Sequence, residues 1–169
     1  MVSYTNMAML FLGIEILSIP MYILAGSNKT DVSSNEAAFK YLIMGAFATG
    51  FLLFGIALIY GATGSFDLKE IASAVSGGLA IPSIFYVGVL LMLIGMAFKV
   101  SAAPFHFWAP DVYQGAPTNV TAYLSTISKG AAVFALMTIL YRTFSMLAVE
   151  WNTILWWIIV ISITVGNLF

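Results

Sequence analysis

The feature that most constrains this chain is an apolar stretch, Met96–Thr118, that carries a lysine at Lys99 and a proline at Pro104. It continues an apolar run that begins at Ser83, and residues 83–113 are too many for one straight crossing, because about 20 residues span a bilayer core. Pro104 cannot donate a backbone hydrogen bond and clashes with the preceding helical turn. The pattern therefore predicts a broken transmembrane segment, and unwound backbone at membrane depth must pack against protein or line a wet cavity.

The composition excludes a soluble domain. Hydrophobic residues make up 62% of the chain, charged residues make up 8%, and the mean hydropathy is +1.02. Soluble chains average about 25% charged residues. A formal net charge of −1 gives no reason to expect a nucleic-acid partner, and without cysteine the chain has no disulfide, thiolate metal site or cysteine nucleophile. An integral membrane protein in contact with the lipid bilayer is the class that remains, and we expect it to bind no metal.

Five apolar segments divide the chain, and we expect each to form a transmembrane helix. The predicted fold is all-α and integral to the membrane, with the third of five transmembrane helices broken and residues 65–80 forming a loop. The expected helices cover about residues 6–25, 36–60, 83–113 and 118–142, and the fifth starts near Asn152 and is still apolar at Phe169.

The two ends of the sequence favour a piece of a longer protein over a complete one. The first apolar run has no basic region before it and contains Glu15, so we expect a retained span and not a signal peptide. Membrane spans normally finish with interfacial anchors, which Gly166–Phe169 does not offer. Residues 143–169 are therefore expected to be the truncated start of the following helix.

Three charged residues lie inside the apolar segments: Glu15, Lys99 and Lys129. Placing a charge at the centre of a membrane helix costs about 2.5–3.5 kcal/mol on insertion scales, so an intramembrane charge indicates a functional site. At helical spacing Glu15 shares a polar face with Ser18 and Tyr22. If Glu15 approaches Lys99, movement of the carboxylate away would expel the lysine's proton, since burial disfavours the charged form. A static buried ion pair and, for Lys129, a purely structural hydrogen-bond donor remain open.

Two further titratable residues have two interpretations each. Lys40 lies about one turn inside the second segment, so it is either an interfacial anchor or a functional group. His106 is the only histidine, and it either relays protons near neutral pH or fills a packing position. The small residues of the second segment predict close helix packing and not a site; they include Gly45, Thr49, Gly50 and Gly55.

Three motifs carry a family resemblance. They are Ile14–Tyr22, Lys40–Leu42 followed by Leu53–Gly55, and above all Phe98–Thr118. Together they resemble the antiporter-like membrane subunits of respiratory complex I, and the run Pro110–Pro117 with the later Ser128–Lys129 is most similar to the subunit N type of bacterial NADH–quinone oxidoreductase. The resemblance covers essentially the whole chain.

The resemblance implies a fold of two inverted five-helix repeats, of which residues 1–142 would be the first. It implies proton translocation coupled to quinone reduction, in which Glu15 pairs with Lys99, Lys129 leads toward the second half and Lys40 is a further lysine. The chain would be a non-redox subunit of a translocase, in a hetero-oligomer with other membrane subunits in the bacterial inner membrane. NADH, FMN, iron–sulfur clusters and quinone would be bound elsewhere in the complex, and no cofactor by this chain.

Two other functions remain open. The chain could belong to a cation/proton antiporter or a membrane-bound hydrogenase of the same superfamily, or it could be a structural helix bundle for complex assembly. The motif Asp111–Pro117 favours complex I over both.

Overall fold

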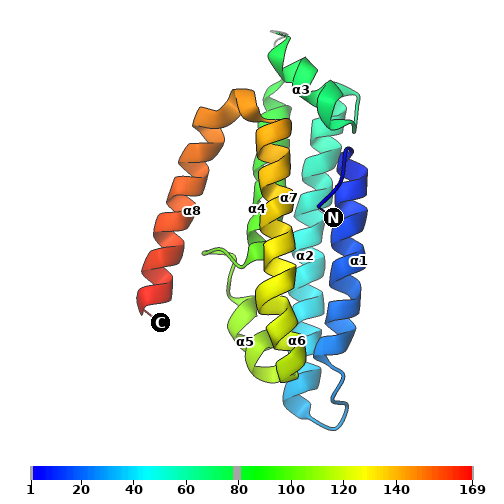
Figure 1. The fold of residues 1–169 in the computed structure, drawn as a ribbon, viewed down its shortest axis with the longest axis vertical. Helices are drawn as coiled ribbons and strands as arrows, with labels where there is room; N and C mark the ends of the chain where they lie inside the picture. The colour runs from blue at the N-terminus through cyan, green and yellow to red at the C-terminus, as the bar shows by residue number, and fades with distance from the viewer. Residues whose placement is uncertain (1, 78–80, 169) are drawn as a thin grey trace.

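The structure, a computed structural model, describes residues 2–77 and 81–168 as a bundle of long helices (Figure 1). The long helices are α1 (Met7–Ala25), α2 (Val32–Thr63), α4 (Ser83–Val100), α7 (Lys129–Arg142) and α8 (Ala148–Leu168). The short ones are α3 (Leu68–Ser76), α5 (Trp108–Gly115) and α6 (Thr118–Tyr123), and a π-helical turn, Leu124–Ser128, joins α6 to α7.

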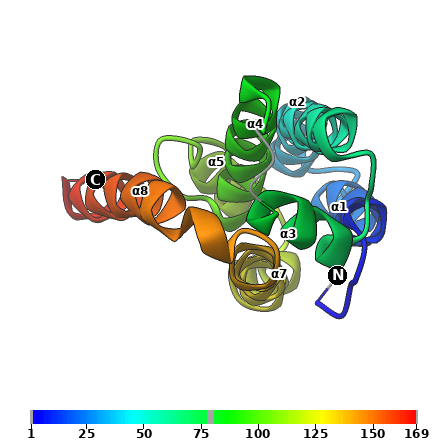
Figure 2. The same ribbon diagram turned by 90° about the horizontal axis from the view of Figure 1, so that it is seen from above.

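Five segments of the described chain are long and apolar enough to cross a membrane. The prediction of five membrane helices is therefore confirmed. The segments are Met7–Ala25, Val32–Thr63, Ser83–Val100, Thr118–Arg142 and Ser145–Leu168. The fourth combines α6, the π-helical turn and α7 into one span, while the fifth diverges from the bundle, as Figure 2 shows for α8.

The predicted bounds were wrong at the polar ends of the helices. Helix α2 begins at Val32 because Asp31 caps it, accepting a hydrogen bond from the Ser33 amide at 3.0 Å. Residues 65–80 were expected to be a loop, yet they contain α3, which lies across one end of the bundle in Figure 1. Asp67 caps α3, and burial of Ile71 holds it against the core; residues 78–80 lie outside the described residues.

The third apolar segment is divided between two helices. Helix α4 ends at Val100, and Ser101 takes the left-handed conformation at φ 58°. The Ala102 amide donates to the Ala97 carbonyl at 2.9 Å, which satisfies one of the carbonyls that a helix end leaves free. Residues 101–107 then form a non-helical connection to α5. The Ala103 amide of this connection donates to Ser162 Oγ of α8 at 2.9 Å.

Helix α2 packs most extensively against α4, and glycines allow the two backbones to touch. A Cβ atom added at Gly55 would lie 2.7 Å from the Gly88 carbonyl oxygen, and one added at Gly88 would lie 2.9 Å from the Gly55 carbonyl oxygen. The packing role predicted for Gly55 is thus confirmed. The same prediction is wrong for Gly50, where an added Cβ would have nothing within 4 Å.

We predict that Gly55→Ala destabilises the chain by about 1–3 kcal/mol, because the added methyl group overlaps backbone that cannot move independently. Gly61→Ala on the same helix is the matched control, since a Cβ there has nothing within 4 Å. Unfolding of both variants in detergent micelles measures the difference, and equal stabilities would contradict the backbone contact.

Candidate functional site

The amine of Lys99, at the end of α4, reaches the polar face of α1. Its Nζ lies 2.8 Å from Ser18 Oγ and 3.3 Å from the Tyr22 hydroxyl oxygen. Ser18 and Tyr22 are buried, so the amine donates to two hydroxyls in an otherwise apolar interior. The polar face predicted on α1 is therefore the face that receives the lysine.

Glu15 is bound by a different helix. Its Oε1 accepts a hydrogen bond from Thr49 Oγ1 of α2 at 3.0 Å. The static ion pair with Lys99 that the sequence left open is absent: in the described ranges, the ion pairs within 4.0 Å all involve Lys40. Carboxylate and amine thus lie along the same face of α1, one held by Thr49 and the other by Ser18 and Tyr22.

An aromatic stack fixes the surroundings of Lys99. The rings of Tyr22 and Tyr41 meet edge to face at 4.6 Å, and Tyr41 stacks on Trp108 at 4.7 Å. Trp108 begins α5, stacks on Phe98 at 5.4 Å, and donates from Nε1 to the Phe98 carbonyl at 3.0 Å. The stack therefore ties α1, α2 and α5 to the residue preceding Lys99.

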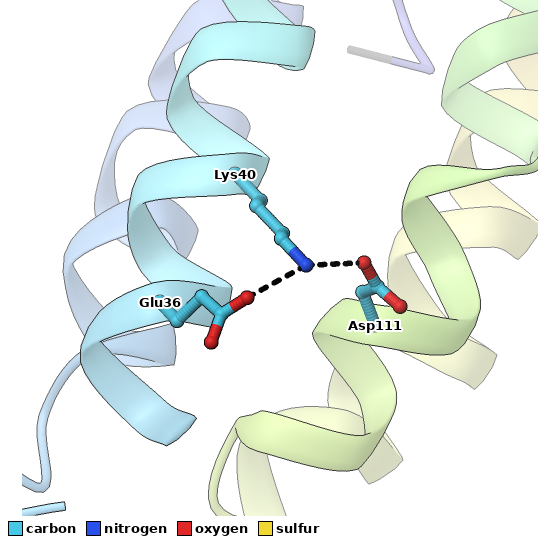
Figure 3. Close-up of polar contacts among 3 residues, drawn as sticks. All are labelled: Glu36, Lys40 and Asp111. Atoms are coloured by element: carbon cyan, nitrogen blue, oxygen red, sulfur yellow. Dashed lines mark hydrogen bonds and ion pairs between the residues drawn. The ribbon is translucent and has the colours of Figure 1, made fainter. Parts of the chain in front are cut away.

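Lys40 forms two ion pairs at the end of the bundle (Figure 3). Its Nζ lies 2.8 Å from Glu36 Oε1 on the same helix and 2.6 Å from Asp111 Oδ2 on α5. All three side chains are partly exposed, and with Ser33 and Gln114 they line a polar cavity of about 150 Å³. Lys40 thus connects α2 with α5, a partnership with Asp111 that spacing along the sequence does not reveal.

Lys129 lies apart from this group, directly after the π-helical turn. Its Nζ sits over the ring of Tyr113, 5.2 Å from the ring centroid. Among the described residues no hydrogen bond or ion pair joins it to Glu15 or Lys99. A π-helical turn inside an α-helical span is frequently found at functional sites.

His106 lies in the connection between α4 and α5. Its Nδ1 is buried and has no hydrogen-bond partner among the described residues, and the same holds for Ser101 Oγ and the Tyr113 hydroxyl. Buried polar atoms are normally satisfied by protein or by water. Three such atoms therefore surround the interruption in the helix. In the described part of the chain, no cluster of three or more His, Asp or Glu side chains could hold a metal ion.

A helical bundle with several apolar spans, and with ionisable side chains facing one another between them, defines a multi-pass integral membrane protein. The family model described as "NADH:quinone oxidoreductase/Mrp antiporter, TM" matches residues 5–169. The chain belongs to this family.

Curated relatives with high sequence identity carry one name. The chain is 52% identical over 168 residues to NADH-quinone oxidoreductase subunit N of Cytophaga hutchinsonii, covering 99% of the chain and 36% of that protein. It is 46% identical over 168 residues to the subunit N of Trichlorobacter lovleyi, covering 99% and 34%. The chain thus spans about a third of the length of these relatives.

Solved structures show the same fold in three kinds of complex. Respiratory complex I from Thermus thermophilus with bound aureothin matches at TM-score 0.69 and 40% identity, over 80% of this chain and 29% of that chain. An archaeal membrane-bound sulfane sulfur reductase matches at TM-score 0.72 and 35% identity, over 82% and 28%. The Mrp complex from Dietzia sp. matches at TM-score 0.73 and 26% identity, over 83% and 26%.

We predict that Trp108→Ala lowers the free energy of unfolding by about 3–5 kcal/mol, because it removes a buried ring from the centre of the aromatic stack. Trp156→Ala is the control, since Trp156 on α8 is 57% exposed, and its loss should cost far less. Unfolding of both variants in detergent micelles tests this expectation, which equal losses would contradict.

Proposed function

We propose that this chain forms part of a proton-translocating membrane subunit of a respiratory NADH–quinone oxidoreductase in a bacterial inner membrane. The observation that carries the proposal is the intramembrane constellation in which Glu15 and Lys99 lie along one face of α1 without pairing directly. Buried ionisable residues that face the interior of a bundle are typical of ion pathways. The names of the relatives supply the complex in which the pathway works.

The proposed mechanism is electrostatic. When Glu15 leaves Thr49 and approaches Lys99, it favours the charged amine, and its return to Thr49 favours release of the proton. Lys129 receives the proton, and the buried polar atoms of Ser101 and Tyr113 bind water between the two lysines. The unwound backbone beside Lys99 then lines a wet cavity, as such backbone must at membrane depth.

Lys40 and His106 have supporting roles in this proposal. The polar cavity beside Lys40, at the end of the bundle, admits water and protons from one side of the membrane. His106 passes protons through its unpartnered Nδ1. Neither role requires a cofactor in this chain, so NADH, FMN, iron–sulfur clusters and quinone act in other subunits, with which this chain forms a hetero-oligomer.

A cation/proton antiporter is the second candidate. It is favoured by the family description, which includes Mrp antiporters, and by the fold match to an Mrp complex. Pumping that follows sodium and is independent of quinone reduction would select it. A membrane-bound hydrogenase or an assembly scaffold would differ again, since neutralising the intramembrane charges of a scaffold changes assembly and leaves proton flux per turnover intact.

We predict that Lys99→Ala and Glu15→Gln, introduced at the gene's own locus, lower the number of protons moved per electron pair. The reason is that each variant removes one charge of the proposed switch. Inverted membrane vesicles give both quantities, proton uptake from a pH-sensitive dye and electron transfer from NADH oxidation.

Lys29→Ala is the matched control, because Lys29 is exposed in the loop between α1 and α2. It should leave the ratio unchanged. A normal ratio in Lys99→Ala and Glu15→Gln, with the complex assembled, would overturn the proposed function.

A further inference from the structure

Tyr22 lies where it can control how closely Glu15 and Lys99 approach. We propose that Tyr22 is a positioning residue for this pair: its hydroxyl holds the Lys99 amine away from Glu15, in a space that exists because residue 45 is glycine. This inference rests on the proposed function and adds a residue to it.

The hydrogen bonds around Lys99 set Tyr22 apart from Ser18. Ser18 Oγ donates its own proton to the Ile14 carbonyl at 2.7 Å, so toward Lys99 it acts as an acceptor only. The Tyr22 hydroxyl also accepts from Lys99, at 3.3 Å, and among the described residues its proton is not committed to a hydrogen bond. A hydroxyl that both accepts and donates can serve the amine in either protonation state.

Packing fixes the Tyr22 ring in this position. The side chain is 6% exposed and its ring meets Tyr41 edge to face at 4.6 Å. On the other side lies Gly45 of α2, and a Cβ atom there would overlap the Tyr22 hydroxyl. The absence of a side chain at position 45 thus leaves the room that the hydroxyl occupies.

The two hydrogen bonds oppose a direct ion pair. Thr49 binds the carboxylate of Glu15, while Ser18 and Tyr22 bind the amine of Lys99. Pairing therefore requires both ions to give up hydroxyl partners. Without the Tyr22 hydroxyl, the equilibrium shifts about tenfold toward the paired arrangement, because the amine loses one of its charge-assisted hydrogen bonds.

The test is Tyr22→Phe at the gene's own locus, which removes one oxygen atom and keeps the ring. We expect the ratio of protons to electrons in inverted vesicles to fall by roughly half or more of the fall caused by Lys99→Ala, on account of the tenfold shift. The amount of assembled complex should stay normal. Tyr41→Phe is the control, since it removes a hydroxyl from the same stack but contributes no hydrogen bond to Lys99.

A second pair of variants tests the space instead of the hydroxyl. Gly45→Ala should lower the ratio as Tyr22→Phe does, because its methyl group displaces the hydroxyl. Gly50→Ala on the same helix should leave the ratio unchanged, because an added Cβ there meets nothing within 4 Å.

The outcomes separate this inference from the function it builds on. A normal ratio in Tyr22→Phe beside a lowered ratio in Lys99→Ala would overturn the inference alone. Loss of assembled complex in Tyr22→Phe, with a normal ratio in the remainder, would show a structural role and also overturn it. A normal ratio in Lys99→Ala would remove the proposed function and the inference together.

Discussion

The constraint on which this structure depends is that a charge inside an apolar layer must find polar partners. Unpaired burial of an ion costs far more than a hydrogen bond returns, so the protein supplies hydroxyls at the depth where ions lie. Ser18 and Tyr22 serve the amine of Lys99, and Thr49 serves the carboxylate of Glu15. Because these partners are neutral, each ion is stabilised without being locked to its opposite, which a direct ion pair would not permit.

Close helix packing makes this arrangement possible. Lipid gives helices no hydrophobic reason to associate, so contact between small residues carries more of the energy than in water. Gly55 and Gly88 bring the backbones of α2 and α4 together, and Gly45 leaves room for the Tyr22 hydroxyl. The same residue type therefore serves helix association in one half of the bundle and the placement of a polar group in the other.

The sequence predicted most of the spans, because about 20 apolar residues in a row have few other uses. It also singled out Glu15 and Lys99, since intramembrane charges are costly. Thr49 was interpreted as a packing residue, and only the helix arrangement shows that its hydroxyl faces Glu15. The pairing of Lys40 with Asp111 was missed because it joins residues 71 positions apart. Helix α3 was missed because its signal is short and polar, a cap at Asp67 and few apolar residues.

The bond from the Ala103 amide to Ser162 has a mechanical consequence. Helix α8 diverges from the rest of the bundle in Figure 2, yet it supplies the acceptor for an amide in the interruption between α4 and α5. A shift of α8 by a few ångströms would strand that amide in apolar surroundings, at a cost comparable to a lost hydrogen bond. The interruption and α8 are therefore coupled: a load applied to the helix 59 residues away is transmitted to the backbone four residues from Lys99.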